Sequence, residues 1–92
     1  MGQVTLKVYA VLGRVAGRTL TEALPAPCSL AEFLRPVAAR HGFADQLFDA
    51  PDRLKRSYTV LVNGVSIYYL NGLNTIVRDG DEIVLMAFVT GG

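Results

Sequence analysis

The sequence predicts one α+β domain in which a single main helix lies across one face of a mixed β-sheet. Three observations carry this prediction: strand-like alternation at both ends of the chain, helical spacing in one segment between them, and turn dipeptides that divide the second half into short strands. A helix and a sheet bury their apolar faces best against each other. The 92 residues leave room for one core, so we expect a single domain over residues 1–92.

The opening segment has the alternation of a strand with one face on a core. Apolar side chains occupy every second position from Val4 to Leu12. Gly13 and Gly17 bracket a turn, after which residues 18–24 are expected to return as a second strand.

The main helix is predicted to begin at a capping box. Ser29 can accept a hydrogen bond from the backbone of Glu32, whose carboxylate can reach back to the backbone of Ser29. Apolar residues recur with helical spacing up to His41, and Gly42 favours the end of the helix. Pro36 removes a backbone hydrogen bond from the interior, so we expect a kink or a break just before it.

The second half of the chain is predicted to be mostly short strands. One helical turn over residues 45–49 is followed by a strand over 58–62, and Asn63-Gly64 then favours a tight hairpin whose returning strand spans 65–69. Turns at 71–72 and 79–80 precede a last strand over 82–89. If this strand lies beside the first and parallel to it, with the helix as the crossover, the domain is a β-grasp.

Composition and charge exclude several classes of function. The formal net charge is +1, and the one basic cluster, Arg53, Lys55 and Arg56, is interpreted as a solvated loop, so we expect no nucleic-acid partner. No apolar run approaches the length of a membrane-spanning helix. Cys28 is the single cysteine, which excludes an internal disulfide and a cysteine-rich metal site and is compatible with a reducing cytoplasm.

The residues suggest no active site of their own. His41, the only histidine, is interpreted as a charge at the end of the main helix. Cys28 lies before the start of that helix, where its thiol pKa could be lowered, but a packing role against Phe33 is favoured. No glycine-rich phosphate-binding motif is present. We therefore expect that the chain binds no cofactor or metal and has no catalytic residues of its own.

Gly91-Gly92 at the end of the sequence has two interpretations. It is either an incidental frayed end or a tail that enters a narrow tunnel in a partner enzyme, since glycine lets a backbone approach another closely. An extended segment from Val89 through Thr90 to Gly92 would reach about 13 Å. The residues alone leave both interpretations open.

The predicted last strand is apolar on both faces. A central strand buried on both sides explains this pattern, and so does an exposed patch that binds another protein. Because a single helix covers only one face, we favour the patch, with Val84, Met86 and Phe88 as its partner-binding residues.

The segments Val60-Leu61-Val62-Asn63-Gly64, Gly72-Leu73-Asn74-Thr75 and Asp79-Gly80-Asp81-Glu82-Ile83 stand in this order before Gly91-Gly92. In these segments, and over nearly the whole chain, the sequence resembles the MoaD/ThiS family of ubiquitin-like β-grasp sulfur carriers. The resemblance is closest to the MoaD branch, the small subunit of molybdopterin synthase.

This resemblance implies that the chain is a carrier or non-catalytic subunit, and that partner enzymes do the chemistry. An E1-like enzyme would use ATP to adenylate the carboxylate of Gly92, and sulfur would then replace the adenylate to leave a thiocarboxylate. A flexible tail of about residues 89–92 would deliver this sulfur to the large, MoaE-like subunit of molybdopterin synthase. Ala87-Phe88 stands where the family commonly carries Pro-Pro. Other acceptors stay open: thiamine, cysteine, tRNA thiolation or secondary-metabolite pathways, or lysines conjugated by a ubiquitin-like modifier.

Overall fold

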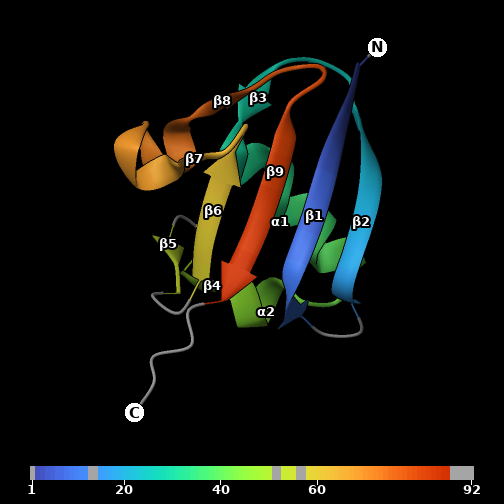
Figure 1. Ribbon diagram of the computed structural model, residues 1–92, viewed down its shortest axis with the longest axis vertical. Coiled ribbons are helices and arrows are strands. Elements are labelled where there is room, and N and C mark those ends of the chain that lie inside the picture. The colour runs from blue at the N-terminus through green and yellow to red at the C-terminus, as the bar shows by residue number, and fades with distance from the viewer. Residues whose placement is uncertain (1, 13–14, 51–52, 56–57, 88–92) are drawn as a thin grey trace.

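The computed structural model describes residues 2–12, 15–50, 53–55 and 58–87. A five-stranded sheet with the order β2-β1-β9-β6-β7 forms its front layer (Figure 1). The central strand β9 pairs in parallel with β1 and antiparallel with β6, which confirms the predicted mixed sheet. The strands are β1 (Gly2–Leu12), β2 (Val15–Leu24), β6 (Tyr58–Val62), β7 (Val65–Ser66) and β9 (Glu82–Ala87).

One main helix, α1 (Leu30–Arg40), lies across the back of this sheet in Figure 1. Two small antiparallel pairs flank it, β3 with β8 and β4 with β5. The remaining elements are α2 (Ala44–Leu47), β3 (Cys28–Ser29), β4 (Phe48–Ala50), β5 (Arg53–Leu54), β8 (Ile76–Val77) and the 3₁₀ turns η1 (Ile67–Tyr69) and η2 (Gly72–Asn74).

The core lies between α1 and the sheet. Alternate residues of each long strand face the helix, as the period of two requires, and α1 contributes its apolar stripe. This arrangement confirms the predicted α+β class. The fully buried side chains of these elements are Val4, Leu6, Val8, Val60, Ile83 and Leu85 from the sheet and Leu30, Leu34 and Ala38 from the helix.

The predicted capping box starts α1. The backbone N–H of Glu32 donates to Ser29 Oγ at 3.2 Å, and the backbone N–H of Ser29 donates to Glu32 Oε1 at 3.4 Å. The helix runs without interruption to Arg40, so the predicted break before Pro36 is wrong. Pro36 lies on the exposed side of α1, where water can satisfy the carbonyl group that loses its partner.

The predicted turn after β6 is confirmed, but the returning strand is shorter than expected. Asn63 and Gly64 have φ of +52° and +85°, which suits a two-residue hairpin turn. Strand pairing ends at Ser66, whose hydroxyl accepts the N–H of Tyr68 at 3.2 Å and starts η1. This local bond competes with continuation of the ladder. At the other hairpin, β2 begins at Val15, earlier than the predicted residue 18.

Candidate functional site

The candidate site begins where β9 ends. Its last residue, Ala87, pairs with Tyr58 of β6, and Met86 pairs with Tyr9 of β1, so neighbouring strands hold the end of β9 on both sides. The predicted attachment residue Gly92, the tail residues Gly91, Thr90 and Val89, and the partner-binding residue Phe88 lie outside the described residues. Five residues follow Ala87 in the sequence, and an extended chain of that length spans about 17 Å.

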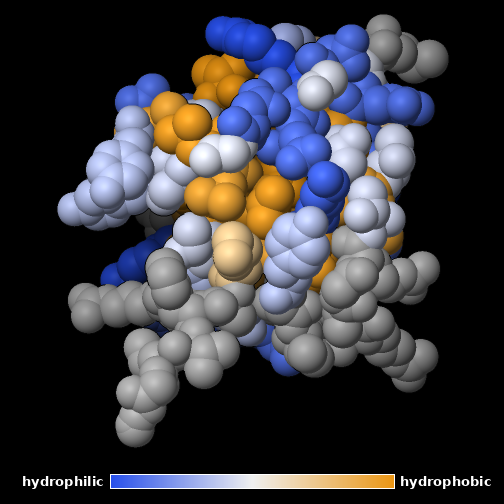
Figure 2. All heavy atoms as spheres, in the orientation of Figure 1, coloured by the Kyte–Doolittle hydropathy of each residue, from blue (hydrophilic) through white to orange (hydrophobic). Residues whose placement is uncertain are grey.

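The second part of the site is the sheet face turned away from α1, which we call the open face. Strand register places alternate residues of β1, β9 and β6 there. Figure 2 shows apolar atoms gathered over β9 and β6 and hydrophilic atoms over β1. Its members are Thr5, Lys7, Tyr9, Thr59, Leu61, Glu82, Val84 and Met86.

The open face is less apolar at its surface than the sequence indicated. Val84, expected to be exposed, is only 7% exposed, because Lys7 and Leu61 stand directly opposite it on the two neighbouring strands. Met86 is 40% exposed, and its cross-strand neighbour Tyr9 is 60% exposed. Sequence reasoning missed Tyr9, although its position off the core face of the first strand was a usable signal.

Polar groups flank this apolar centre. Lys7 Nζ lies 3.3 Å from Glu82 Oε2, and both side chains are partly exposed. An exposed pair of this kind contributes little to stability. An apolar centre with Tyr and Met, beside a charged margin, has the composition of a surface that binds another protein.

The contacts of Cys28 and His41 indicate structural roles. Cys28 packs against the core; burial raises the pKa of its thiol, and the nearby Glu32 carboxylate adds to that rise. This agrees with the packing interpretation and opposes an activated thiol. His41 caps the end of α1, stacks on Phe43 with ring centroids 6.3 Å apart, and places Nε2 3.6 Å from Glu22 Oε2.

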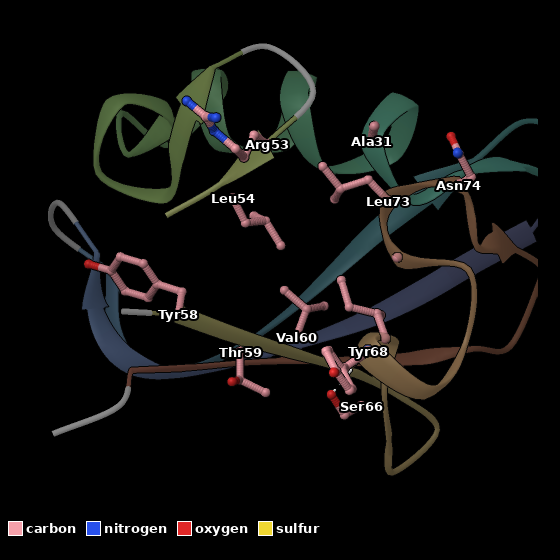
Figure 3. Close-up of a pocket in the computed structure, with 12 residues that line it drawn as sticks. Ala31, Arg53, Leu54, Tyr58, Thr59, Val60, Ser66, Tyr68, Leu73 and Asn74 are labelled. Carbon is pink, nitrogen blue, oxygen red and sulfur yellow. Dashed lines mark hydrogen bonds between the residues drawn. The ribbon is translucent and has the colours of Figure 1, made fainter. Parts of the chain in front are cut away.

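A hollow of about 530 Å³ lies between β6, α1 and η2 (Figure 3). Leu54, Val60 and Leu73 form apolar walls, and Arg53 is the one charged side chain among the described residues that line it. The described residues that line this hollow do not bring an acid, a base and a nucleophile together. Among the described residues, no three His, Cys, Asp or Glu side chains are grouped to hold a metal ion. None of the helices there is both long and apolar enough to span a membrane.

Comparison with solved structures agrees with this geometry. The crystal structure of SAMP1 from Haloferax volcanii is 27% identical, with a TM-score of 0.79, and the match covers 99% of this chain and 100% of that one. The crystal structure of the BexX/CysO complex from Amycolatopsis orientalis contains a chain 26% identical, with a TM-score of 0.76 and coverage of 97% and 99%. CysO from Mycobacterium tuberculosis, at 22% identity, a TM-score of 0.77 and coverage of 94% and 99%, shows the shared fold.

No curated protein matches the chain. The ThiS family model, in contrast, matches residues 6–92, which is nearly the whole sequence. Members of this family are small ubiquitin-like carriers of sulfur rather than catalysts. The chain therefore belongs to the ThiS family.

Proposed function

We propose that this chain carries sulfur as a thiocarboxylate on Gly92. The single observation that carries the proposal is the match of the ThiS family model through residue 92, which includes the Gly91-Gly92 end of the sequence. The carboxylate of Gly92 would attack the α-phosphate of ATP in an E1-like enzyme and release pyrophosphate. A sulfur nucleophile would then displace AMP from the acyl-adenylate.

The position of β9 supports this proposal. β9 is the central strand, and Met86 near its end is paired with Tyr9 of β1 on one side and with Thr59 of β6 on the other. A tail that begins at the end of a rigid strand starts from a fixed point on the domain, which limits the region that its far end can reach. The ATP in this scheme is bound by the activating enzyme, and the chain itself supplies only the carboxylate.

The open face would bind the enzymes that receive the tail. Met86 and Tyr9 lie at the end of the sheet where β9 stops, and Val84 lies on the same face two residues back along β9. A partner that covers these residues would hold the root of the tail close to its own active site. Phe88, immediately after β9, would extend the same contact.

For the acceptor, we propose the large, MoaE-like subunit of molybdopterin synthase, in the cytoplasm. The support is the sequence resemblance to the MoaD branch. A second candidate is conjugation of Gly92 to lysines, since the chain is 27% identical to SAMP1, which is described as a small archaeal modifier protein. The likeness to a chain of the BexX/CysO complex favours a third possibility, a carrier for a different sulfur-accepting enzyme.

An acceptor assay separates these candidates. Thiocarboxylated chain would be mixed with the molybdopterin synthase large subunit of the same organism and its pterin substrate, with Gly92→Ala as the control. Our proposal predicts a sulfur-containing pterin and a returned carboxylate only with the unsubstituted chain. Higher-mass species on a denaturing gel, lost in Gly92→Ala, with no transfer to the pterin, would favour the modifier instead.

A further inference from the structure

The strand β2 forms the free border of the five-stranded sheet. It pairs with β1 on one side, and no described element pairs with its other side, the right-hand margin in Figure 1. It is also long, spanning Val15–Leu24. A long open edge presents unpaired backbone groups to any strand that can align with it.

The register determines which backbone groups of β2 point outward. On β1, the N–H of Thr5 donates to the carbonyl of Asp81, and the carbonyl of Gln3 accepts the N–H of Gly80, so both residues direct their backbone toward the β9 side. The even-numbered residues Val4 and Leu6 therefore direct theirs toward β2, because backbone groups alternate along a strand.

Val4 and Leu6 stand opposite Glu22 and Leu20, and these are the hydrogen-bonded pairs of the β1–β2 ladder. The intervening residues of β2 must then direct N–H and C=O away from the sheet. These residues are Thr19, Thr21 and Ala23, and all three are exposed. No hydrogen bond joins their outward backbone groups to another described residue.

This edge lacks the protection that sheet borders usually carry. Over residues 19–24 there is no lysine and no proline, and the one charged side chain is Glu22. Glu22 faces the helix side, where it pairs with Arg40 and lies 3.6 Å from His41. Its charge is therefore engaged within the chain and does little to repel an incoming strand.

We propose that β2 pairs antiparallel with β2 of a second copy, about a two-fold axis at Thr21. In this register Thr21 stands opposite the partner's Thr21 and Thr19 opposite the partner's Ala23, so the outward groups meet as hydrogen-bonded pairs. Glu22 stands opposite the partner's Leu20, so no described like charges face each other. Paired threonines are favourable cross-strand neighbours. The sequence of β2 is thus complementary to itself.

The proposed dimer is independent of sulfur transfer and leaves the proposed tail free. β1 separates β2 from β9. The end of β9, with Met86 on the open face, therefore lies away from the two joined β2 strands. Each copy would keep its own open face for an activating enzyme.

Thr21→Pro provides the first test, because proline removes only the outward N–H of Thr21 and leaves the ladder to β1 intact. Thr21→Val keeps that N–H and is the matched control. We expect sedimentation equilibrium from micromolar to millimolar concentration to show a monomer–dimer equilibrium for the unsubstituted chain and for Thr21→Val. Two intermolecular hydrogen bonds are lost in Thr21→Pro, so its dissociation constant should rise about tenfold or more. Circular dichroism would verify that both variants fold.

A cross-linking test examines the register and does not depend on the stability of Thr21→Pro. In a Cys28→Ser background, Thr21→Cys would place two cysteines about 5.5 Å apart between Cα atoms, within disulfide range. Thr19→Cys is the matched control, since its counterpart lies four residues along the strand. We expect a covalent dimer with Thr21→Cys only. A monomer at every concentration, equal association of the proline and valine variants, or cross-linking at Thr19 would overturn the proposal.

Discussion

The side-chain amide of Asn63 donates a hydrogen bond to Asp81 Oδ1 at 3.0 Å and joins the turn after β6 to the turn before β9. Asn63 Oδ1 also accepts the backbone N–H of Glu82 at 2.9 Å, and Asp81 Oδ2 accepts the backbone N–H of Arg78 at 2.8 Å. Both residues belong to the segments that carry the family resemblance. Their contacts fix where β9 begins.

We predict that Asn63→Ala and Asp81→Ala each lower the free energy of unfolding by about 1–2 kcal/mol, because each leaves hydrogen-bonding groups without partners. The double variant should lose less than the sum, since both changes remove the same bond. Urea denaturation of all four proteins measures this. Asn63→Gly removes the same side-chain bonds, but glycine adopts the positive φ without strain. Comparison with Asn63→Ala therefore separates the cost of backbone strain from the cost of the lost bonds. Strict additivity would mean that the two residues act independently.

Much of the fold follows from local patterns in the sequence. Alternation identifies the long strands, the capping box places the start of α1, and Asn63-Gly64 specifies its turn, because each pattern restricts the backbone within a few residues. The parallel pairing of the first and last strands follows from a single crossover helix. The candidate open face follows from the second apolar face of the last strand.

The errors arise where surroundings override a local pattern. Pro36 does not interrupt α1, because its exposed side lets solvent replace the lost partner. Ser66 ends β7 by bonding to Tyr68, a competition that alternation cannot reveal. Val84 is covered by neighbours on both sides, and that depends on strand order and register, which a single strand pattern does not contain.

Pro36→Ala should stabilise the protein. An alanine at this position restores the backbone N–H that can bond to the carbonyl of Glu32 and removes the steric conflict of the ring in a helix interior. We expect a gain of about 1–3 kcal/mol in the free energy of unfolding, measured by urea denaturation. Arg35→Ala, on the exposed side of the same helix, is the control and should be nearly neutral. A loss of stability in Pro36→Ala would show that the ring itself packs favourably.

Cys28 should react slowly with iodoacetamide. Burial and the Glu32 carboxylate raise the pKa of its thiol, so at pH 8 less of it is the reactive thiolate than in an unstructured cysteine. The rate should increase as the pH rises toward that higher pKa. It should also increase on denaturation, and quenched samples analysed by mass spectrometry measure both. Faster alkylation of the folded chain than of the denatured chain would contradict the packing role.

Met86→Ala should weaken binding to the activating enzyme without unfolding the domain. Its side chain is partly exposed on the open face, so truncation leaves the core intact while removing an interface contact. We expect a loss of about 1–3 kcal/mol in binding free energy, measured by calorimetry. Tyr69→Ala is the control, because Tyr69 is also exposed but lies on η1. Equal losses of binding free energy in the two variants would show that the activating enzyme does not bind specifically at Met86.

The most direct test of the proposed function is the intact mass of the chain after incubation with the E1-like enzyme of its own organism, ATP and a sulfur donor. We predict a mass increase equal to the replacement of one oxygen by sulfur, located at Gly92 by fragmentation and absent without ATP. An unchanged mass, with an activating enzyme shown to be active on another carrier, would contradict the assignment of this chain as a carrier of sulfur on Gly92.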